Sequence, residues 1–172
     1  LVPPLRELAV PERQVLGGFA PLDRALSAPQ RFPVFNLMAP EGRYYGFPEW
    51  DVPGFKIGLY HHLQEQGAAE TLSREPNARD EAALRSGIER FFPEANGDCL
   101  ALRACIFTNT PDEHFILDTL PGFPEVVVAS PCSGHGYKFA SVIGEILAGL
   151  AMDRRPALDI SLFALNRFTA SA

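Results

Sequence analysis

Short runs dominated by hydrophobic residues, each bounded by Pro or Gly, fill the first third of the chain. They lie at positions 14–20, 33–38 and 43–47, and a further run follows at 55–61. Runs of this length and composition are typical of β-strands. We therefore expect several short strands here, followed by a polar and irregular surface loop over 64–76.

A one-sided hydrophobic pattern predicts a helix that begins after Asn77 and ends near Phe92. Asn is a favoured N-cap, and Asp80 and Glu81 bring negative charge into the first turn, where the helix dipole favours it. Apolar residues then recur at the i, i+4 and i+8 spacing of a helix with one buried face. Pro93 ends the pattern.

The C-terminal part of the chain has strand patterns followed by one strongly apolar helix pattern. Residues 100–108 alternate as in a strand, and 115–118 with 126–129 predict a hairpin across 120–122. Residues 137–151 are small or apolar on nearly every face, which predicts a buried helix. This order of elements predicts an α+β fold with a mostly antiparallel sheet, flanking helices and a C-terminal strand, turn and helix.

The turn before the last helix is the strongest local sign of a binding site. It reads Ser133-Gly134-His135-Gly136, and Lys138 lies in the first turn of the predicted helix. Backbone N–H groups and the helix dipole converge at such a terminus and favour an anion or an electron-rich ring edge. A glycine turn without a ligand is the structural alternative.

Composition excludes several classes of function. The 172 residues are 47% hydrophobic, which is enough for a core, and carry a net charge of −6, which argues against a nucleic-acid partner. No apolar run reaches the roughly 18 residues that span a membrane. Cys99, Cys105 and Cys132 form no C-x-x-C pair, so we expect no metal site and no disulfide framework. A reduced, cytoplasmic setting fits this pattern.

A series of motifs then points to a known family. The chain contains Y-Y-G-F-P at 44–48, G-F-K-I-G-L-Y-H-H at 54–62, C-I-F-T-N-T-P-D-E-H-F-I-L-D at 105–118, S-G-H-G-Y-K-F at 133–139, G-E-I-L at 144–147, and D-I-S-L-F at 159–163 followed by Arg167. Together these resemble the monomeric sarcosine oxidase and N-methyltryptophan oxidase family, flavin-dependent amine oxidases of the D-amino-acid-oxidase-like superfamily. The resemblance covers nearly the whole chain.

The same resemblance implies that half of the oxidase is missing. The family's N-terminal half carries a G-x-G-x-x-G fingerprint for the ADP part of FAD. The chain lacks it, since Gly136 is followed by Phe139 where the third glycine belongs. We expect residues 1–104 to belong to the substrate-binding domain and 105–172 to the C-terminal part of the FAD-binding domain. A fragment of a longer oxidase and one subunit of a split oxidase are both open.

Two residues acquire cofactor chemistry from the resemblance. A cysteine in an apolar strand is normally a small buried hydrophobe, but the family's matching cysteine bonds covalently to the flavin, which assigns this role to Cys105. A lysine such as Lys56 would otherwise be a solvated strand residue. In the family it lies above the flavin ring and promotes the reaction with oxygen, because a fixed cation stabilises the charge that develops.

The family's amine pocket is expected to involve Tyr45, Tyr60 and His61. Tyr45 matches an active-site tyrosine, and the histidine of the G-Y-H motif lines the pocket. Leu59 is an extra residue relative to the shorter Lys-x-Gly-Tyr-His version. If Leu59 forms a bulge, His61 keeps the histidine's place; otherwise Tyr60 takes it. We favour His61 as the catalytic residue and expect Tyr60 to contact the substrate. Two surface imidazoles at a strand end are the simpler alternative.

The resemblance also assigns the glycine turn. Ser133, Gly134, His135, Gly136 and Tyr137 are expected to approach the flavin's pyrimidine edge. Lys138 is expected both to contact the cofactor region and to bind the substrate carboxylate, beside an arginine from the absent half. Asp112, Glu113 and His114 precede a strand, and we interpret them as a solvated turn.

The implied activity is the oxidation of a secondary amine, an N-methyl amino acid such as sarcosine, to an imine, with FAD as cofactor and oxygen reduced to hydrogen peroxide. The N-terminal half would be needed in cis or in trans, and this chain alone is expected to be inactive. Two alternatives stay open: a non-catalytic scaffold or split-oxidase subunit, and an oxidase for a cyclic imino acid such as pipecolate or proline.

Overall fold

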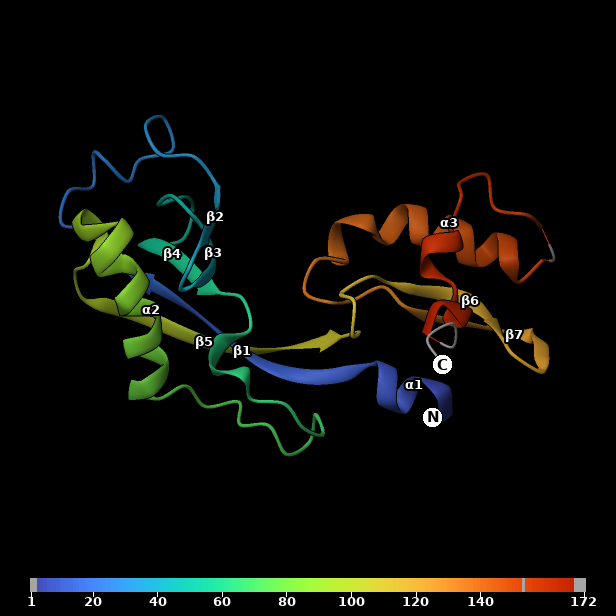
Figure 1. Cartoon of the computed structure of the whole chain (residues 1–172). Helices are drawn as coiled ribbons and strands as arrows, with labels where there is room; N and C mark the ends of the chain where they lie inside the picture. Colours follow the sequence, from blue (N-terminus) through green and yellow to red (C-terminus); the bar gives the residue numbers. More distant parts are fainter. Residues whose placement is uncertain (1–2, 153, 169–172) are drawn as a thin grey trace. The chain divides into compact units, whose positions relative to one another are not determined.

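The computed structural model describes residues 3–152 and 154–168 (Figure 1). Its contacts divide the chain into two compact units. One is Glu12–Ile106, and the other combines Leu1–Pro11 with Phe107–Ala172. The first residues thus join the C-terminal segment. The assignment of the two parts to substrate and cofactor stays a prediction.

The unit Glu12–Ile106 is built on a five-stranded sheet with the order β2-β3-β4-β1-β5. The pairs β2–β3, β3–β4 and β4–β1 are antiparallel, which confirms the predicted α+β fold. The elements are β1 (Val10–Phe19), β2 (Phe35–Ala39), β3 (Gly42–Phe47), β4 (Phe55–Leu59), α2 (Ala78–Phe91) and β5 (Cys99–Asn109), with short 3-10 turns η1 (His62–Gln64) and η2 (Pro93–Ala95).

Helix α2 begins where the sequence predicts. Asn77 accepts a hydrogen bond from the backbone N–H of Arg79, and Asp80 accepts one from the N–H of Asn77 at 2.8 Å, which completes a capping box. The buried face of α2, Leu84 and Ile88, packs in one core with side chains from the sheet. On β4, Phe55 and Ile57 are buried in that core, so the alternate residues of the strand point to the opposite face.

A buried polar network lies beside this core. The guanidinium of Arg13 donates two hydrogen bonds to Asp80, at 2.7 and 2.8 Å, and two more to the carbonyl oxygens of Ser73 and Glu75. Nε2 of His62 lies 2.9 Å from the same Asp80 carboxylate. All three charged or titratable side chains are at most 1% exposed. The network therefore ties β1, the 64–76 loop and the start of α2 to η1.

The second unit contains the predicted hairpin and the last helix. Strands β6 (Ile116–Leu120) and β7 (Phe123–Ser130) pair antiparallel. The other elements are α1 (Pro3–Leu8), η3 (Tyr137–Phe139), α3 (Ala140–Leu150), η4 (Ser161–Phe163) and η5 (Leu165–Phe168). Phe115, Leu117, Ile143 and Ile146 form one small core, and Ile116, Val128 and Leu165 form another.

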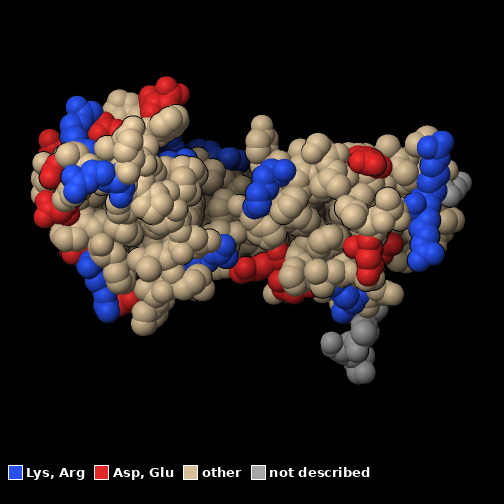
Figure 2. Space-filling model, turned by 90° about the horizontal axis from the view of Figure 1, so that it is seen from above, with Lys and Arg blue, Asp and Glu red and all other residues tan. Residues whose placement is uncertain are grey.

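Helix α3 differs from its expected burial. Only Ile143 and Ile146 are buried, whereas Ala140, Gly144 and Ala148 are exposed. The helix thus packs by one face, and its small residues line the surface. Within the described part of the chain, no helix is long and apolar enough to cross a membrane. Figure 2 shows acidic and basic side chains interspersed on the face that it displays.

Candidate functional site

One face of the five-stranded sheet gathers the residues expected around the amine. Tyr45 of β3 is the cross-strand partner of Gly58 of β4, and Phe47 is the partner of Lys56. The Tyr45 ring lies directly over Gly58, since a Cβ atom there would be 2.6 Å from the Tyr45 hydroxyl oxygen. The absent side chain of Gly58 therefore lets the tyrosine ring lie close to the strand that carries Lys56.

Tyr60 joins this group just after β4 ends. Its ring meets the Tyr45 ring edge-on, with 6.1 Å between centroids. The Arg43 guanidinium lies 4.5 Å from the Tyr60 ring centroid, a cation–π contact. Burial, followed by the nearby Cys105 and Tyr60, raises the pKa of Tyr45 to about 12. Tyr45 is therefore a protonated phenol, able to donate a hydrogen bond, throughout the physiological range.

Cys105 of β5 lies within electrostatic reach of Lys56. The thiol is half-buried, and burial raises its pKa, while the positive charges of Lys56 and Arg74 act in the opposite direction. The Lys56 ammonium itself lies 4.9 Å from the Phe47 ring centroid. The structure thus brings Cys105, Lys56 and Tyr45 into one cluster.

The position of His61 depends on how β4 ends. The β3–β4 pairing runs in unbroken register from Lys56 to Leu59, so the ladder contains no bulge at Leu59. The chain turns immediately afterwards: His61 has φ 57°, and Leu63 and Gln64 have φ 50° and 54°. Nδ1 of His61 lies 3.0 Å from the buried Glu12 carboxylate. Tyr60 thus contacts Tyr45, whereas His61 contacts Glu12 and, edge-on, the Tyr60 ring.

The glycine turn belongs to the other unit and is held by its own contacts. Ser133 is fully buried, and its N–H donates to the carbonyl of Thr108 at 2.9 Å. Ser133 and Gly134 have φ 49° and 73°, a left-handed pair. A Cβ atom on Gly136 would overlap the Pro131 carbonyl oxygen. The turn therefore requires glycine at Gly136 for its close approach and favours it at Gly134 for its backbone.

The side chains of this turn are less enclosed. The His135 ring stacks on Phe115 with 4.9 Å between centroids, and Nε2 donates to the Glu113 carbonyl at 3.0 Å. The Lys138 ammonium donates to the His135 carbonyl at 2.8 Å and is exposed, and Tyr137 is 97% exposed. The predicted residues thus form two clusters, one in each unit.

Sequence reasoning missed several residues of these clusters. Glu12 and Arg43 carried no motif, although Glu12 precedes two further polar residues at the start of a strand. Asp112 lies in an exposed turn, as expected, and in addition Arg167 donates to it at 2.7 Å. The arginine of the C-terminal motif was the available signal. Among the described residues, no group of His, Cys, Asp and Glu could hold a metal ion.

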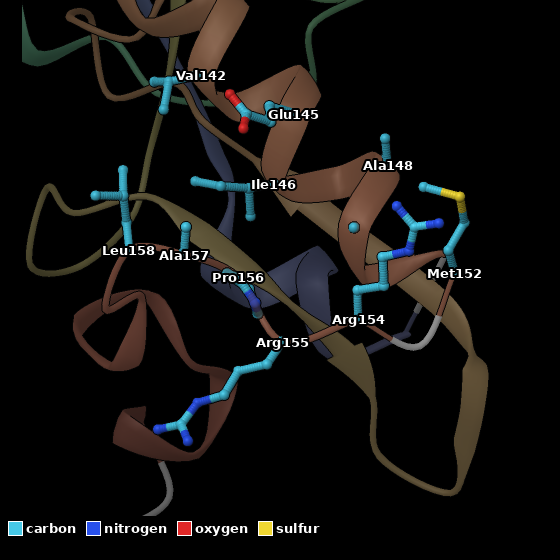
Figure 3. Close-up of a pocket in the computed structure, with 11 residues that line it drawn as sticks. Val142, Glu145, Ile146, Ala148, Met152, Arg154, Arg155, Pro156, Ala157 and Leu158 are labelled. Carbon is cyan, nitrogen blue, oxygen red and sulfur yellow. The ribbon is translucent and has the colours of Figure 1, made fainter.

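A pocket elsewhere in the second unit contains none of the predicted residues. It has a volume of about 320 Å³ and lies between α3 and the segment around 154–158. Figure 3 shows Ile146 with Ala157 and Leu158 on the facing segment, while the Arg155 side chain points away from them. This pocket has no catalytic group that sequence or geometry connects to the two clusters.

The chain is similar in sequence and in fold to known oxidases. The family described as "FAD dependent oxidoreductase" matches residues 1–150. Monomeric sarcosine oxidase from Bacillus sp. (strain NS-129) is 43% identical over 159 residues, which cover 91% of this chain and 41% of that protein. N-methyl-L-tryptophan oxidase from Salmonella heidelberg (strain SL476) is 42% identical over 165 residues, with coverages of 92% and 42%. The chain spans about two fifths of these relatives.

Solved structures show the same fold. Fructosyl amine:oxygen oxidoreductase (Amadoriase I) from Aspergillus fumigatus matches 95% of this chain and 40% of its own, with a TM-score of 0.72 and 18% identity. Glycine oxidase from Geobacillus kaustophilus matches 93% of this chain and 40% of its own, with a TM-score of 0.64 and 20% identity. The chain therefore belongs to the FAD-dependent oxidoreductase family, and its sequence is similar to those of sarcosine and N-methyl-L-tryptophan oxidases.

Proposed function

We propose that the full-length protein oxidises a secondary amine of the N-methyl amino acid type to an imine and reduces oxygen to hydrogen peroxide. Its relatives are named for sarcosine and N-methyl-L-tryptophan, both N-methyl amino acids. The observation that carries the proposal is the cluster of Cys105, Lys56 and Tyr45 on one sheet face.

FAD fits the residues of both clusters. Cys105 is half-buried on the sheet face that carries Lys56, and the positive charges of Lys56 and Arg74 oppose the rise in its pKa that burial causes. The turn from Ser133 to Tyr137 has a left-handed backbone at Ser133 and Gly134, and Gly136 packs against the Pro131 carbonyl, so the protein itself fixes the shape of the turn. Cys105 would thus anchor the flavin, and the turn with Lys138 would contact it.

When bound, FAD would accept the hydride equivalent from the amine and pass electrons to oxygen. Lys56 would provide a fixed positive charge where oxygen acquires negative charge, which lowers the free energy of that step. Tyr45 would donate a hydrogen bond in the amine pocket, and Tyr60 with His61 would line it. Of these two, Tyr60 contacts Tyr45 directly.

Lys138 would bind the substrate carboxylate. Its ammonium carries three donors, and the His135 carbonyl accepts from it at 2.8 Å, so two remain for an anion. An arginine from the N-terminal half would complete the clamp. That half would also hold the ADP part of FAD, so the activity requires it in cis or in trans.

The test uses the full-length protein and measures peroxide release with sarcosine, N-methyl-L-tryptophan, glycine and pipecolate. We expect turnover of the N-methyl amino acids, no comparable turnover of glycine, and a flavin adduct on the Cys105 peptide by mass spectrometry. Cys105→Ser should abolish the adduct, whereas Cys99→Ser, on the same strand, should retain it. Oxidation of glycine at least as fast as of N-methyl substrates would refute the substrate class, and faster oxidation of pipecolate would favour a cyclic imino acid.

A further inference from the structure

A buried carboxylate behind His61 has no role in the proposed chemistry. Glu12 of β1 is 1% exposed, whereas the His61 side chain is 36% exposed. The Glu12 oxygens lie 3.0 and 3.2 Å from Nδ1 of His61. The same carboxylate accepts hydrogen bonds from the side-chain amides of Gln14, at 2.9 Å, and Gln66, at 3.0 Å. The Glu12 carboxylate is thus an acceptor surrounded by nitrogen groups from three side chains, near the beginning of β1.

The orientation of the Gln14 amide is independently determined. Its Oε1 accepts a hydrogen bond from the backbone N–H of His62 at 3.2 Å, so its Nε2 must face Glu12. A backbone N–H can only donate, which excludes the flipped amide. Glu12 therefore faces a donor at this position whatever its own charge.

The charge of Glu12 follows from these contacts. Burial tends to raise the pKa of this carboxyl, but the hydrogen bonds from Gln66, Gln14 and His61 outweigh burial and lower it. An ionised carboxylate has only acceptors. Nδ1 of His61 must therefore carry the proton that it shares with Glu12, which makes Nε2 the proton-free nitrogen of the neutral ring.

We propose that Glu12 is a positioning residue, which holds His61 in its Nδ1–H tautomer and makes Nε2 the atom that accepts a proton or a hydrogen bond. The tautomer itself does not depend on the proposed function; only its use in the amine pocket rests on it. A carboxylate behind an imidazole generally fixes ring orientation and raises the basicity of the far nitrogen. Glu12 would thus act on the substrate only through His61.

The direct test is the His61 tautomer in the full-length protein, labelled with ¹⁵N-histidine and measured at a pH where the ring is neutral. The His61 signals are identified by their loss in His61→Gln. We expect the Nδ1–H form to dominate in the unmodified protein. Dominance of the Nε2–H form would overturn the proposal without any Glu12 variant.

The role of Glu12 is tested by substitution. Oε1 of Glu12 accepts from Gln14 and faces Nδ1 of His61, so Glu12→Gln would keep its amide oxygen there and should retain the Nδ1–H form. Glu12→Leu removes the acceptor, so the Nε2–H form should become populated. Glu12→Asp, which keeps the charge, should retain the Nδ1–H form in part. Glu65→Gln removes a charge from the same region, where Glu65 pairs with Arg13, and should leave the tautomer unchanged. An unchanged tautomer in Glu12→Leu would overturn the assignment.

Kinetics then separate this inference from the proposed function. Behind metal-binding histidines, loss of such a partner costs roughly 10- to 100-fold. We expect a comparable loss of kcat/KM in Glu12→Leu and partial recovery in Glu12→Asp. A protein without amine oxidase activity would refute the proposed function while leaving the tautomer result intact. An active oxidase whose kcat/KM is unaffected by Glu12→Leu would refute the catalytic use of His61.

Discussion

At the scale of single residues, the cluster of Tyr45, Lys56 and Cys105 depends on the absence of a side chain at Gly58. Tyr45 occupies the space above its cross-strand partner, and a Cβ atom at Gly58 would be 2.6 Å from the tyrosine hydroxyl oxygen. Gly58 has no positive φ that would require glycine. Gly58 is therefore needed for the space that it leaves and not for its backbone conformation. Because it has no side chain, the Tyr45 ring can lie against β4 beside Lys56.

Gly58→Ala should accordingly displace Tyr45. We expect a loss of about 1–3 kcal/mol in the free energy of unfolding, typical of overpacking, measured by chemical denaturation. In a Tyr45→Ala background the same change should cost much less, because the clash is gone. Gly18→Ala on β1 is the matched control, since the nearest atom to its added Cβ would be 3.7 Å away. Equal costs of Gly58→Ala in both backgrounds would contradict this account.

At the scale of elements, one buried ion pair joins segments that are distant in sequence. Arg13 of β1 and Asp80 of α2 are 67 positions apart and form two hydrogen bonds with almost no exposure. Hydrogen bonds from Arg13 are the main reason that the pKa of Asp80 lies well below its usual range. His62 shares the carboxylate, so the turn that follows β4 is attached to α2 through Asp80.

Asp80→Asn should therefore destabilise the unit far more than a surface carboxylate change. Removing one partner of a buried pair leaves the other charge without compensation and costs about 3–5 kcal/mol. Glu81→Gln, one residue later in the same helix turn, breaks only a partly exposed pair with Arg85 and should cost about 0.5 kcal/mol or less. Denaturant midpoints of the two variants compare them directly, and similar shifts would argue against the network.

Most of the helices and strands could be predicted from the sequence, because they depend on residues that are close together in the chain. The N-cap at Asn77 and the hairpin across 120–122 follow from neighbouring residues and are confirmed. The buried network around Asp80 could not be predicted from the sequence. Polar residues such as Arg13 and His62 are normally exposed, and the residue that they contact lies far from them in the sequence. The prediction that α3 is buried on nearly every face was wrong, since only Ile143 and Ile146 are buried. An apolar sequence indicates that a helix tends to be buried, but it does not show which residues cover each face.

The candidate site could be predicted only in part, because some of its contacts join residues that are far apart in the sequence. Motifs identified Tyr45, Lys56 and Cys105, and the structure brings these together. No motif indicated Glu12, whose meaning arises only from contacts to His61, Gln14 and Gln66. The strand register, and not the sequence, shows that β4 ends without a bulge at Leu59. By the criterion stated for Leu59, this favours Tyr60 over His61 for the position of the family's histidine.

At the scale of the whole molecule, carboxylates outnumber basic side chains, 21 to 15. The paired ones contribute to stability in both units. Hydrogen bonds from Arg167 lower the pKa of Asp112 to about 2 in the second unit, and Arg13 lowers the pKa of Asp80 in the first. A carboxyl with a depressed pKa stabilises the fold above its unfolded pKa of about 4 and loses this effect as the pH falls through its folded pKa.

The free energy of unfolding should therefore decline as the pH falls from about 4 to about 2. Asp112→Asn should be less stable than the unmodified chain at pH 7, and this difference should shrink as the pH falls towards about 2 and vanish below it, where Asp112 is protonated in the folded state as well. The exposed Glu125→Gln, on β7, provides the control and should change little over this range. A difference between Asp112→Asn and the unmodified chain that persists well below pH 2 would assign the effect to packing.

The left-handed turn from His61 to Gln64 affects which mutations would impair the protein. Positive φ at Leu63 costs on the order of 1 kcal/mol, so the turn persists only while its surroundings hold it. Those surroundings include Asp80, whose carboxylate lies 2.9 Å from Nε2 of His62. A mutation of Asp80 would displace the turn that follows Tyr60, and if Tyr60 and His61 line the proposed amine pocket, a genetic screen for lost activity would recover this mutation together with mutations in the pocket itself. Selection for folding and selection for the proposed activity would therefore act on the same position, Asp80.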